Sequence, residues 1–405
     1  MKKLLLILAL FLLVATQALA QDFSMGEETK GLKVKISDDT DITMRIRLQP
    51  RIDFGDIIKS KDGKSYSSDM DMYLRRIRLE FEGKLAKDLK YSLIIEGDKN
   101  GKAGKTSASA ANEVKIQYAY LDYKFVDAFN IRFGKTKLPY SRVSLTSSSK
   151  QLIIERPVST EAAKKLFDDY YQPSLLLHGG IAEGIFNYNL AIADGWENGN
   201  TLYSKGKYRT TDSADTKVFN GGPLYVARIE LSPPGWTEKG KSDAWLGQGQ
   251  HLTLAANYAA QKGIEYSADN TIANVYEEDR TLTGFDVSGH WNGIIAQFEY
   301  NIWNQKYTDP NKKEEKPEGW YGQAGYFVSG LNIEPIARYE VYDQDSNSSD
   351  KMEKTTTIGV NWYAKGHSFK VGLNWASTKY DKNASGWLAN DDKKDVYQLQ
   401  GQLYF

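Results

Sequence analysis

ITMRIRLQPRIDF, residues Ile42–Phe54, is the stretch of sequence that decides the fold. Every even position in it is apolar and every odd position is polar, and three of the polar residues are Arg45, Arg47 and Arg51. Thirteen residues that alternate with a period of two predict a β-strand with one apolar face and one cationic face. This length is unusual for a soluble strand but fits a strand that crosses a bilayer at a tilt.

The same alternation recurs along the rest of the chain. Clear examples occupy residues 76–82, 89–96, 114–118, 131–133, 186–192, 298–302, 358–362 and 369–375, and weaker ones lie near 172–182, 223–232, 250–260, 281–291, 319–329 and 331–342. With a last strand at 394–405, they predict an all-β protein, an antiparallel barrel of about 16 strands. The links between them alternate between short turns and long polar loops, as in bacterial outer-membrane barrels, which have an even number of strands.

The last predicted strand continues to the final residue. Apolar Tyr397, Leu399, Leu403 and Phe405 alternate there with polar residues. Outer-membrane barrels characteristically end on such a strand because the assembly machinery reads it, so we expect Phe405 to take part in that recognition. A secreted soluble β-sandwich is the competing fold, but its strands average about six residues and have no reason to end in this way.

The N-terminus has the pattern of a secretory signal peptide. Two lysines precede the apolar segment Leu4–Val14, and Ala18–Ala20 forms an A-x-A cleavage site. We therefore expect residues 1–20 to be removed after Ala20, leaving residues 21–405 as a single barrel domain. The apolar segment is too short for a comfortable helical span, which makes an uncleaved membrane anchor the weaker alternative.

The composition excludes several classes of protein. No later segment approaches 18 consecutive apolar residues, so a helical membrane protein is not predicted. Cysteine is absent, which rules out disulfides, thiolate metal sites and cysteine nucleophiles. The four histidines have no metal-ligand spacing. Aromatic residues make up 12% of a chain whose mean hydropathy is −0.54, which suits a barrel with a polar lumen, an apolar outer band and aromatic girdles.

The net charge of zero hides an uneven distribution of charged residues. Residues 41–156 contain 23 Lys and Arg against 15 Asp and Glu, whereas residues 157–405 contain 24 against 32. The basic excess therefore lies in the part of the chain that contains the opening strand. The acidic excess of the remainder leaves open how strongly the barrel selects anions, because those carboxylates would act differently in the lumen and in the outer loops.

Six short motifs stand out besides the alternation. They are Arg75–Gly83 (RRIRLEFEG), Ala119–Tyr123 (AYLDY), Ile131–Ser141 (IRFGKTKLPYS), Glu155–Pro157 (ERP), Leu177–Gly179 (LHG) and Pro335–Glu340 (PIARYE). Together they resemble the phosphate-selective porins of the O and P type. The resemblance implies a homotrimer of barrels with about 16 strands each, whose third external loop folds into the pore as a constriction. It also implies a ladder of arginines that leads to a lysine-lined anion site.

Basic residues recur on the polar faces of the first predicted strands. A charge that faces lipid near the bilayer centre costs about 2–4 kcal/mol, so these residues should face a water-filled lumen. Adjacent strands lie about 4.8 Å apart, so their side chains would form a continuous basic wall of the kind that selects anions. The candidates are Arg45, Arg47, Arg51, Arg76, Arg78, Lys90, Lys115 and Arg132. The alternative for each is a salt bridge inside the lumen, since Glu80, Glu82, Glu96 and Asp98 share the same face.

The loop that follows Phe133 is the expected constriction. Residues 134–160 combine cations and hydroxyl groups with few acidic side chains. Cations supply charge and hydroxyls supply hydrogen-bond donors, the combination that a tetrahedral oxyanion needs. The candidates here are Lys135, Lys137, Arg142, Ser147, Ser148, Ser149, Lys150 and Arg156. An ordinary solvated loop is the alternative interpretation of the serine run.

The expected function is passive uptake of small anions, phosphate or polyphosphate, through a channel in the bacterial outer membrane. A general, weakly selective diffusion porin is the main alternative. An outer-membrane enzyme or adhesin barrel is the third, although no G-x-S-x-G-like motif supports catalysis. We expect no enzymatic activity, no cofactor, no metal and no nucleic acid partner. The expected partners are small anions, membrane lipid, the assembly machinery and further copies of the chain.

Overall fold

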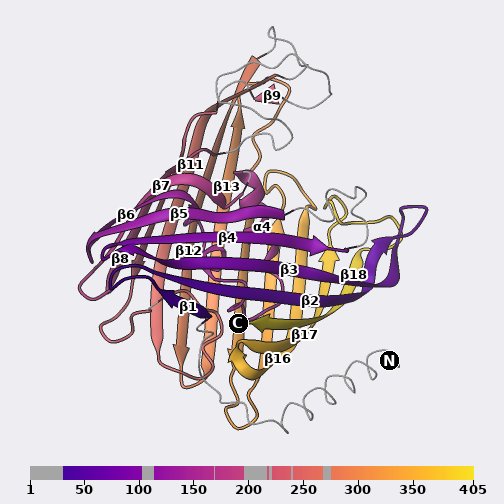
Figure 1. The fold of residues 1–405 in the computed structure, drawn as a ribbon. Helices are drawn as coiled ribbons and strands as arrows, with labels where there is room; N and C mark the ends of the chain where they lie inside the picture. The colour runs from indigo at the N-terminus through magenta and orange to yellow at the C-terminus, as the bar shows by residue number, and fades with distance from the viewer. Residues whose placement is uncertain are drawn as a thin grey trace.

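The computed structural model describes residues 31–102, 114–167, 169–195, 217–218, 221–238, 240–267 and 275–405. Within these residues, sixteen strands form one closed antiparallel barrel, as the alternation predicted (Figure 1). The expected signal peptide lies outside the described residues. In this part of the chain no helix is long and apolar enough to cross a membrane.

The barrel strands follow the chain order around the ring, and β8 pairs directly with β10. They are β2 (Asp41–Lys59), β3 (Tyr66–Ala86), β4 (Leu89–Asn100), β5 (Val114–Val126), β6 (Phe129–Lys137), β7 (Tyr171–Ile181), β8 (Phe186–Ala193), β10 (Leu224–Leu231), β11 (His251–Ser267), β12 (Val275–Trp291), β13 (Ile294–Tyr307), β14 (Glu318–Tyr326), β15 (Ile333–Asp343), β16 (Met352–His367), β17 (Phe369–Tyr380) and β18 (Lys393–Tyr404).

The remaining described elements are short. The strands β1 (Leu32–Lys35) and β9 (Lys217–Val218) pair with the beginning of β2 and the end of β11. The helices α3 (Arg142–Leu145) and α4 (Val158–Leu166) both belong to the long segment between β6 and β7. This segment and the barrel wall around it position the site described below.

The ring closes where β18 pairs with β2, the strand that contains the opening stretch. Leu399 lies opposite Ile52, and Leu403 lies opposite Leu48. The backbone N–H of Phe405 donates to the carbonyl of Ile46 at 3.0 Å, and the N–H of Ile46 donates back at 2.6 Å. The terminal alternation in the sequence thus belongs to the strand that completes the barrel.

The alternation in β2 corresponds to an outer and an inner face. The odd positions point inward, and the side chains of Arg47, Gln49 and Arg51 are buried in the barrel. The even positions point outward, and Met44 is 41% exposed. Other strands likewise present apolar side chains outside, such as Phe133, which is 67% exposed. An apolar exterior around a polar interior is the arrangement of a transmembrane barrel.

One β-bulge changes which side chains of β3 face the lumen. Gln49 lies opposite Arg76, but the next residue, Pro50, lies opposite Leu74, so Arg75 is an extra residue in the ladder. Proline has no N–H to give to a ladder and is commonly found at such irregularities. Because of the bulge, two consecutive residues, Arg75 and Arg76, are both buried on the inner side of the wall.

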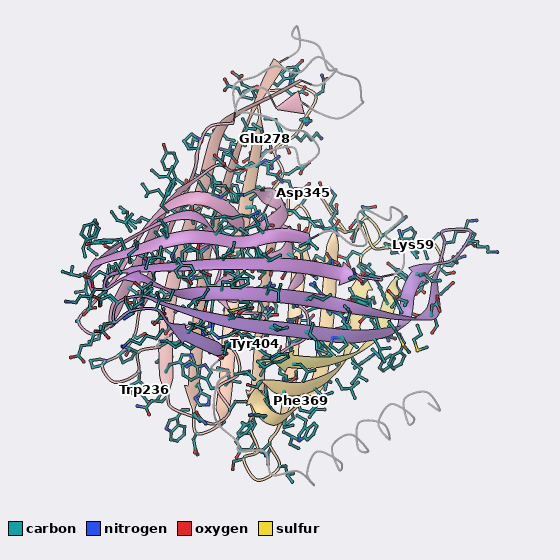
Figure 2. The ribbon with its side chains drawn as sticks, viewed as in Figure 1. Lys59, Trp236, Glu278, Asp345, Phe369 and Tyr404 are labelled. Carbon is teal, nitrogen blue, oxygen red and sulfur yellow. The ribbon has the colours of Figure 1, made fainter. Side chains whose placement is uncertain are left out.

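The two ends of the barrel differ in their connections. The long loops join strands at one end, where Lys59, Glu278 and Asp345 lie, and Trp236 and Phe369 lie toward the other (Figure 2). At that second end most links are short turns, such as the single residue between β16 and β17. The link between β10 and β11, residues 232–250, is the exception, and the sequence did not single it out. We call it the long turn.

Candidate pore and its constriction

The segment between β6 and β7, residues 138–170, enters the barrel and is called here the inward loop. The expected loop began at residue 134, but β6 pairs with β7 as far as Lys137, so Lys135 and Lys137 belong to the barrel wall. Its backbone is hydrogen-bonded to side chains of β16, β17 and β18. Asn361 donates to the carbonyl of Leu152 at 2.7 Å, and Lys370 donates to the carbonyl of Gln151 at 3.0 Å. On β2, Arg47 donates to the hydroxyl of Ser148 at 3.1 Å.

Carboxylates of β13 and β15 hold the same loop from another part of the wall. Glu299 accepts hydrogen bonds from the Ser141 hydroxyl and the Arg142 N–H, each at 3.1 Å, at the start of α3. Glu340 accepts a bond of 2.6 Å from the N–H of Val158, the first residue of α4. The first N–H groups of a helix lack partners within the helix, and a carboxylate satisfies them well.

The long turn also enters the barrel and meets the inward loop from the opposite end. The Arg142 guanidinium makes two hydrogen bonds to Glu238, at 2.7 and 2.8 Å, and both side chains are 1% exposed. The N–H groups of Asp243 and Ala244 donate to the carbonyl of Lys150 at 3.0 and 3.1 Å. Burial opposes ionisation of Glu238, but Arg142 and Lys241 hold its pKa at about 2.

Apolar packing completes the contact between the two inward segments and the wall. Leu152 and Ile153 of the inward loop pack with Ala244 of the long turn and with Ile295 and Tyr363 of the wall. A second cluster joins both ends of the inward loop to the strands β7, β8 and β10–β13, and it contains Leu138, Tyr140, Leu166, Phe167, Leu224, Leu282 and Trp303. These clusters fill part of the lumen, and open space remains beside the basic wall and beside α4.

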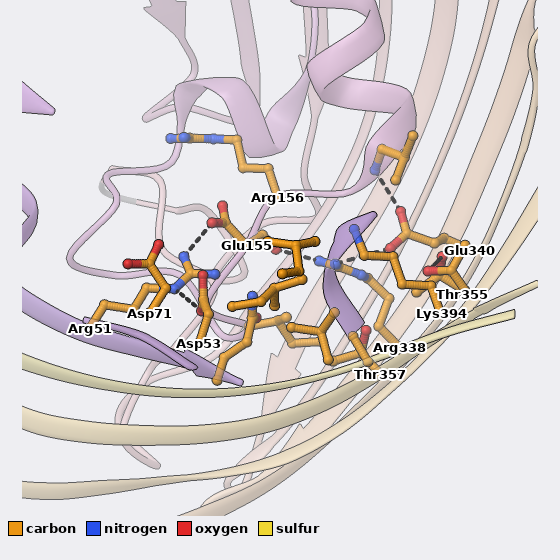
Figure 3. A pocket seen from close by; sticks show the side chains of 18 of the residues that line it. Arg51, Asp53, Asp71, Glu155, Arg156, Arg338, Glu340, Thr355, Thr357 and Lys394 are labelled. Carbon is orange, nitrogen blue, oxygen red and sulfur yellow. Dashed lines mark hydrogen bonds and ion pairs between the residues drawn. The ribbon is translucent and has the colours of Figure 1, made fainter. Parts of the chain in front are cut away.

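Three cavities border the inward loop, and two of them adjoin the basic wall; the third, of about 470 Å³, lies between α4 and later strands and is lined by Arg280, Trp303 and Glu353 among others. The upper cavity, toward the long loops, has a volume of about 330 Å³ and is lined by Arg51, Glu155, Arg156, Arg338 and other polar residues (Figure 3). The lower cavity, toward the short turns, has a volume of about 270 Å³. It is lined by Arg47, Arg78, Glu80, Glu82, Tyr118, Tyr120, Arg132, Lys137 and further residues of the same wall.

Three of the predicted residues are buried cations near the inward loop whose hydrogen-bond partners are neutral; Lys370, which the sequence did not single out, is a fourth. Arg76 donates to the amide oxygen of Gln49 at 3.1 Å. Lys137 donates to the carbonyls of Leu145 and Thr146, both at 3.1 Å. Arg156 donates to the Thr146 carbonyl at 3.2 Å and to that of Val143 at 3.2 Å. Within the described residues none of the three forms an ion pair, and we call them the cation triad.

The cation triad connects the two cavities, because Arg156 lines the upper one and Lys137 the lower one. Lys137 and Arg156 donate to the same carbonyl, that of Thr146, at 3.1 and 3.2 Å. Gln49, the partner of Arg76, donates to the carbonyl of Ser148 in the same loop at 3.3 Å. Tyrosine rings cover two of them: Lys137 lies 5.7 Å from the ring centre of Tyr171, and Arg156 lies 5.3 Å from that of Tyr170. Among the predicted residues, these three combine burial with the lack of an ion pair in the described part of the chain.

Most of the other predicted strand cations lie inside the barrel but are paired with acids. Nitrogen–oxygen distances are 2.7 Å for Arg47 with Glu80, 2.6 Å for Arg51 with Asp53, 2.6 Å for Arg45 with Glu82 and 2.6 Å for Arg132 with Asp122, and Arg78 pairs with Glu96. The proposed alternative, a lumenal salt bridge, thus describes these five residues.

The remaining predicted residues are spread over the wall and the inward loop. Lys90 is exposed beside the turn between β3 and β4, whereas Lys115 and Lys135 are partly exposed on β5 and β6. Ser147 and Ser149 bond to each other at 3.0 Å through their hydroxyls. Arg142 forms an ion pair with Glu238. The hydroxyl of Ser148 accepts a hydrogen bond from Arg47, and the backbone carbonyl of Lys150 accepts hydrogen bonds from the long turn.

Sequence reasoning missed Arg75 and the residues that hold the inward loop. The period-two pattern places Arg75 on the outer face, and only Pro50 in the opposite strand hints at the bulge that turns it inward. Glu155 was noticed only as part of a motif, yet it bonds to Arg51 and, at 3.4 Å, to Arg75. Arg338 and Lys370 likewise reach the loop from later strands.

A closed sixteen-stranded barrel with an apolar exterior, an inward loop and polar cavities defines an outer-membrane porin. The family model described as "Phosphate-selective porin O and P" matches residues 44–405, and the chain belongs to that family. The family and the fold point to a channel of the bacterial outer membrane rather than to an enzyme.

Individual relatives agree with this assignment. An uncharacterised protein of Aquifex aeolicus is 39% identical, with 94% of this chain and 91% of the relative covered. Porin O of Pseudomonas aeruginosa is 24% identical, with 98% and 97% covered. Among solved structures, an anion-selective porin from Comamonas acidovorans has a TM-score of 0.57 at 13% identity, covering 90% of this chain and 100% of that one. The channel DcaP of Acinetobacter baumannii has a TM-score of 0.57 at 14% identity, covering 93% and 99%.

Proposed function

We propose that the protein conducts small anions across the outer membrane through the upper cavity, past the cation triad and into the lower cavity. The observation that carries the proposal is the triad itself. Arg76, Lys137 and Arg156 are 4%, 7% and 7% exposed and have no carboxylate partner within the described residues. Removing a charge from water costs several kcal/mol, and a passing anion offsets part of that cost.

The path is basic because of how the inward loop is held. The carboxylates Glu299 and Glu340 are occupied with the loop backbone, and Glu238 is occupied with Arg142. These acids belong to the second part of the chain, whose negative excess left anion selectivity open. Their engagement in holding the loop leaves the triad without a carboxylate partner in the described part of the chain, although Glu340 also lines the upper cavity.

Phosphate is the solute that we place first. The triad offers a planar guanidinium for paired hydrogen bonds and a lysine as a compact point charge, which together suit a tetrahedral oxyanion. The family description names phosphate selectivity, and one structural relative is described as an anion-selective porin. We further propose a homotrimer, since a trimer form is described for the similar barrel OmpT of Vibrio cholerae. Cleavage of a signal at Ala20 and recognition of Phe405 during assembly belong to the same proposal.

A weakly selective diffusion porin is the second candidate, and one observation favours it. The upper cavity is lined by the cations Arg51, Lys102, Arg156, Arg338 and Lys394 and by an equal number of acids, Asp53, Asp69, Asp71, Glu155 and Glu340. A cavity in which acidic and basic side chains balance attracts neither anions nor cations strongly. The selectivity of the whole channel then depends on the triad.

Planar-bilayer recording of the purified protein tests the proposal. A salt gradient of potassium chloride should give a reversal potential of the sign expected for chloride permeation, and added phosphate should reduce the chloride current. A reversal potential near zero with no reduction by phosphate supports the weakly selective porin. Absence of any conductance would refute both.

A further inference from the structure

Glu155 sits where the upper cavity meets the cation triad. It is the neighbour of Arg156 in the inward loop and lines the upper cavity, and 38% of its side chain is exposed. Its carboxylate Oε1 accepts hydrogen bonds from the Arg51 guanidinium and, at 3.4 Å, from Nε of Arg75. Figure 3 shows the carboxylate directed toward Arg51 across the cavity.

The two arginines that hold Glu155 also have partners on the wall. Arg51 pairs with Asp53 at 2.6 Å, and Arg75 pairs with Asp98. These wall acids lie on the strands β2 and β4, whereas Glu155 is carried by the loop. The arginines therefore keep a counter-charge when Glu155 leaves, so they form a site that a different anion can occupy.

The carboxylate stays ionised over the working range of pH. Burial acts against its charge, but Arg51 and Arg75, with Arg76 behind them, hold the pKa of Glu155 well below its usual range. It is thus a permanent anion bound at the entrance to the triad. A permeating oxyanion of similar charge and shape would seek the same guanidinium groups.

We propose that Glu155 is a tethered anion that occupies the first binding position of the path, and that a permeating oxyanion must displace it. This inference rests on the proposed function, because it assumes that anions pass the triad. The tethered carboxylate lowers the net affinity of the arginine cluster for free anions. Conduction needs binding that is strong enough for entry and weak enough for release, and Glu155 sets this balance.

The geometry also defines which solutes compete with it. The site holds a carboxylate through guanidinium donors from two neighbouring strands, so its ligands are small oxyanions, carboxylate or phosphate. Thr355, Thr357 and Lys394 line another part of the same 330 Å³ cavity, where Thr355 and Lys394 lie near Glu340 (Figure 3). Chloride lacks the spaced oxygens and competes less well.

The test compares Glu155→Gln with the control Glu315→Gln. Each substitution removes one negative charge from the protein. Glu315 is exposed in the link between β13 and β14 and lines neither the upper nor the lower cavity. Inhibition of chloride current is measured with phosphate and, separately, with acetate, after heat-modifiability on gels has shown that each barrel is assembled.

We expect Glu155→Gln to lower the half-inhibiting concentration of phosphate and of acetate about tenfold, and Glu315→Gln to change it less than twofold. Equal effects of the two variants, no effect of Glu155→Gln, or weaker inhibition in it would overturn the tethered-anion proposal. If Glu155→Gln does not assemble, Glu155→Asp takes its place, because it keeps the charge but shortens the reach of the carboxylate. Unchanged inhibition of the chloride current by phosphate in Glu155→Asp would also overturn the tethered-anion proposal. A wild-type channel without anion preference would instead overturn the proposed function.

Discussion

Replacing Glu238 with glutamine should loosen the inward loop from the long turn. The substitution keeps the shape of the side chain but leaves the Arg142 guanidinium without its counter-charge in a place where it is 1% exposed. Arg142 retains one hydrogen bond of 3.0 Å, to the carbonyl of Ser242, and Lys241 retains Glu230 at 2.7 Å. The loss therefore falls mainly on Arg142.

The magnitude follows from the burial of the pair. Removing one partner of a buried ion pair costs about 3–5 kcal/mol, and the lower end applies here because the amide oxygen of glutamine still accepts one bond from Arg142. A cost of about 3 kcal/mol changes an equilibrium constant by roughly a hundredfold. If the whole cost is borne by docking of the loop, the undocked fraction should rise by that factor.

The absence of cysteine makes the measurement clean. Ser144 is 1% exposed and lies two residues after Arg142, so Ser144→Cys provides a single thiol that is protected while the loop is docked. Its rate of reaction with a water-soluble maleimide should rise roughly a hundredfold in the Glu238→Gln background. Glu82→Gln, on the opposite wall, is the control and should leave the rate unchanged. A rise of less than about threefold in Glu238→Gln would refute the reasoning.

Three further predictions follow from the same contacts. Lys137→Glu should move the reversal potential toward cation permeation, since it turns one member of the triad negative, whereas Lys90→Glu at the exposed turn should not. Lowering the pH on the side of the long turn should destabilise the docked loop. The lowered pKa of Glu238 contributes stability that is complete above the usual carboxyl pKa and is lost as the pH falls through about 2. Fluctuations of the channel current should therefore appear between about pH 4 and pH 2. Deletion of Phe405 removes both backbone bonds to Ile46 at the closing seam, and the yield of heat-modifiable barrel should fall.

The sequence predicted the barrel because its strands obey a local rule. In β2 the inner and outer faces follow from alternation alone, and Arg47 and Arg51 point inward as expected. The weakly alternating segments, such as 223–232, have a physical explanation in the structure. Leu224 and Val226 of β10 face inward yet are apolar, because the inward loop packs against them. Their alternation is therefore blurred where the lumen is filled by protein.

The parts of the site that the sequence did not predict depend on contacts between distant segments. The pairing of Arg142 with Glu238 joins residues 96 positions apart, and no periodicity links them. Arg142 was grouped with the anion ligands because its neighbours are hydroxyls and cations. A basic residue in a loop has the same sequence signature whether it faces a solute or a buried carboxylate, and only the position of the long turn separates the two cases.

The uneven charge along the chain becomes an uneven charge across the lumen. A barrel lined by interspersed acids and bases would have a nearly neutral path, and the overall net charge of zero suggests just that. The chain departs from this outcome at the triad, because the acids of later strands, Glu299 and Glu340, accept hydrogen bonds from the loop backbone and do not pair with the triad. The upper cavity still has balanced charge, since Glu340 and other acids line it, so the positive charge is concentrated at the triad. The selectivity of the channel is thus a property of how the loop is held, and a substitution that releases the loop should weaken anion preference without touching any cation of the path.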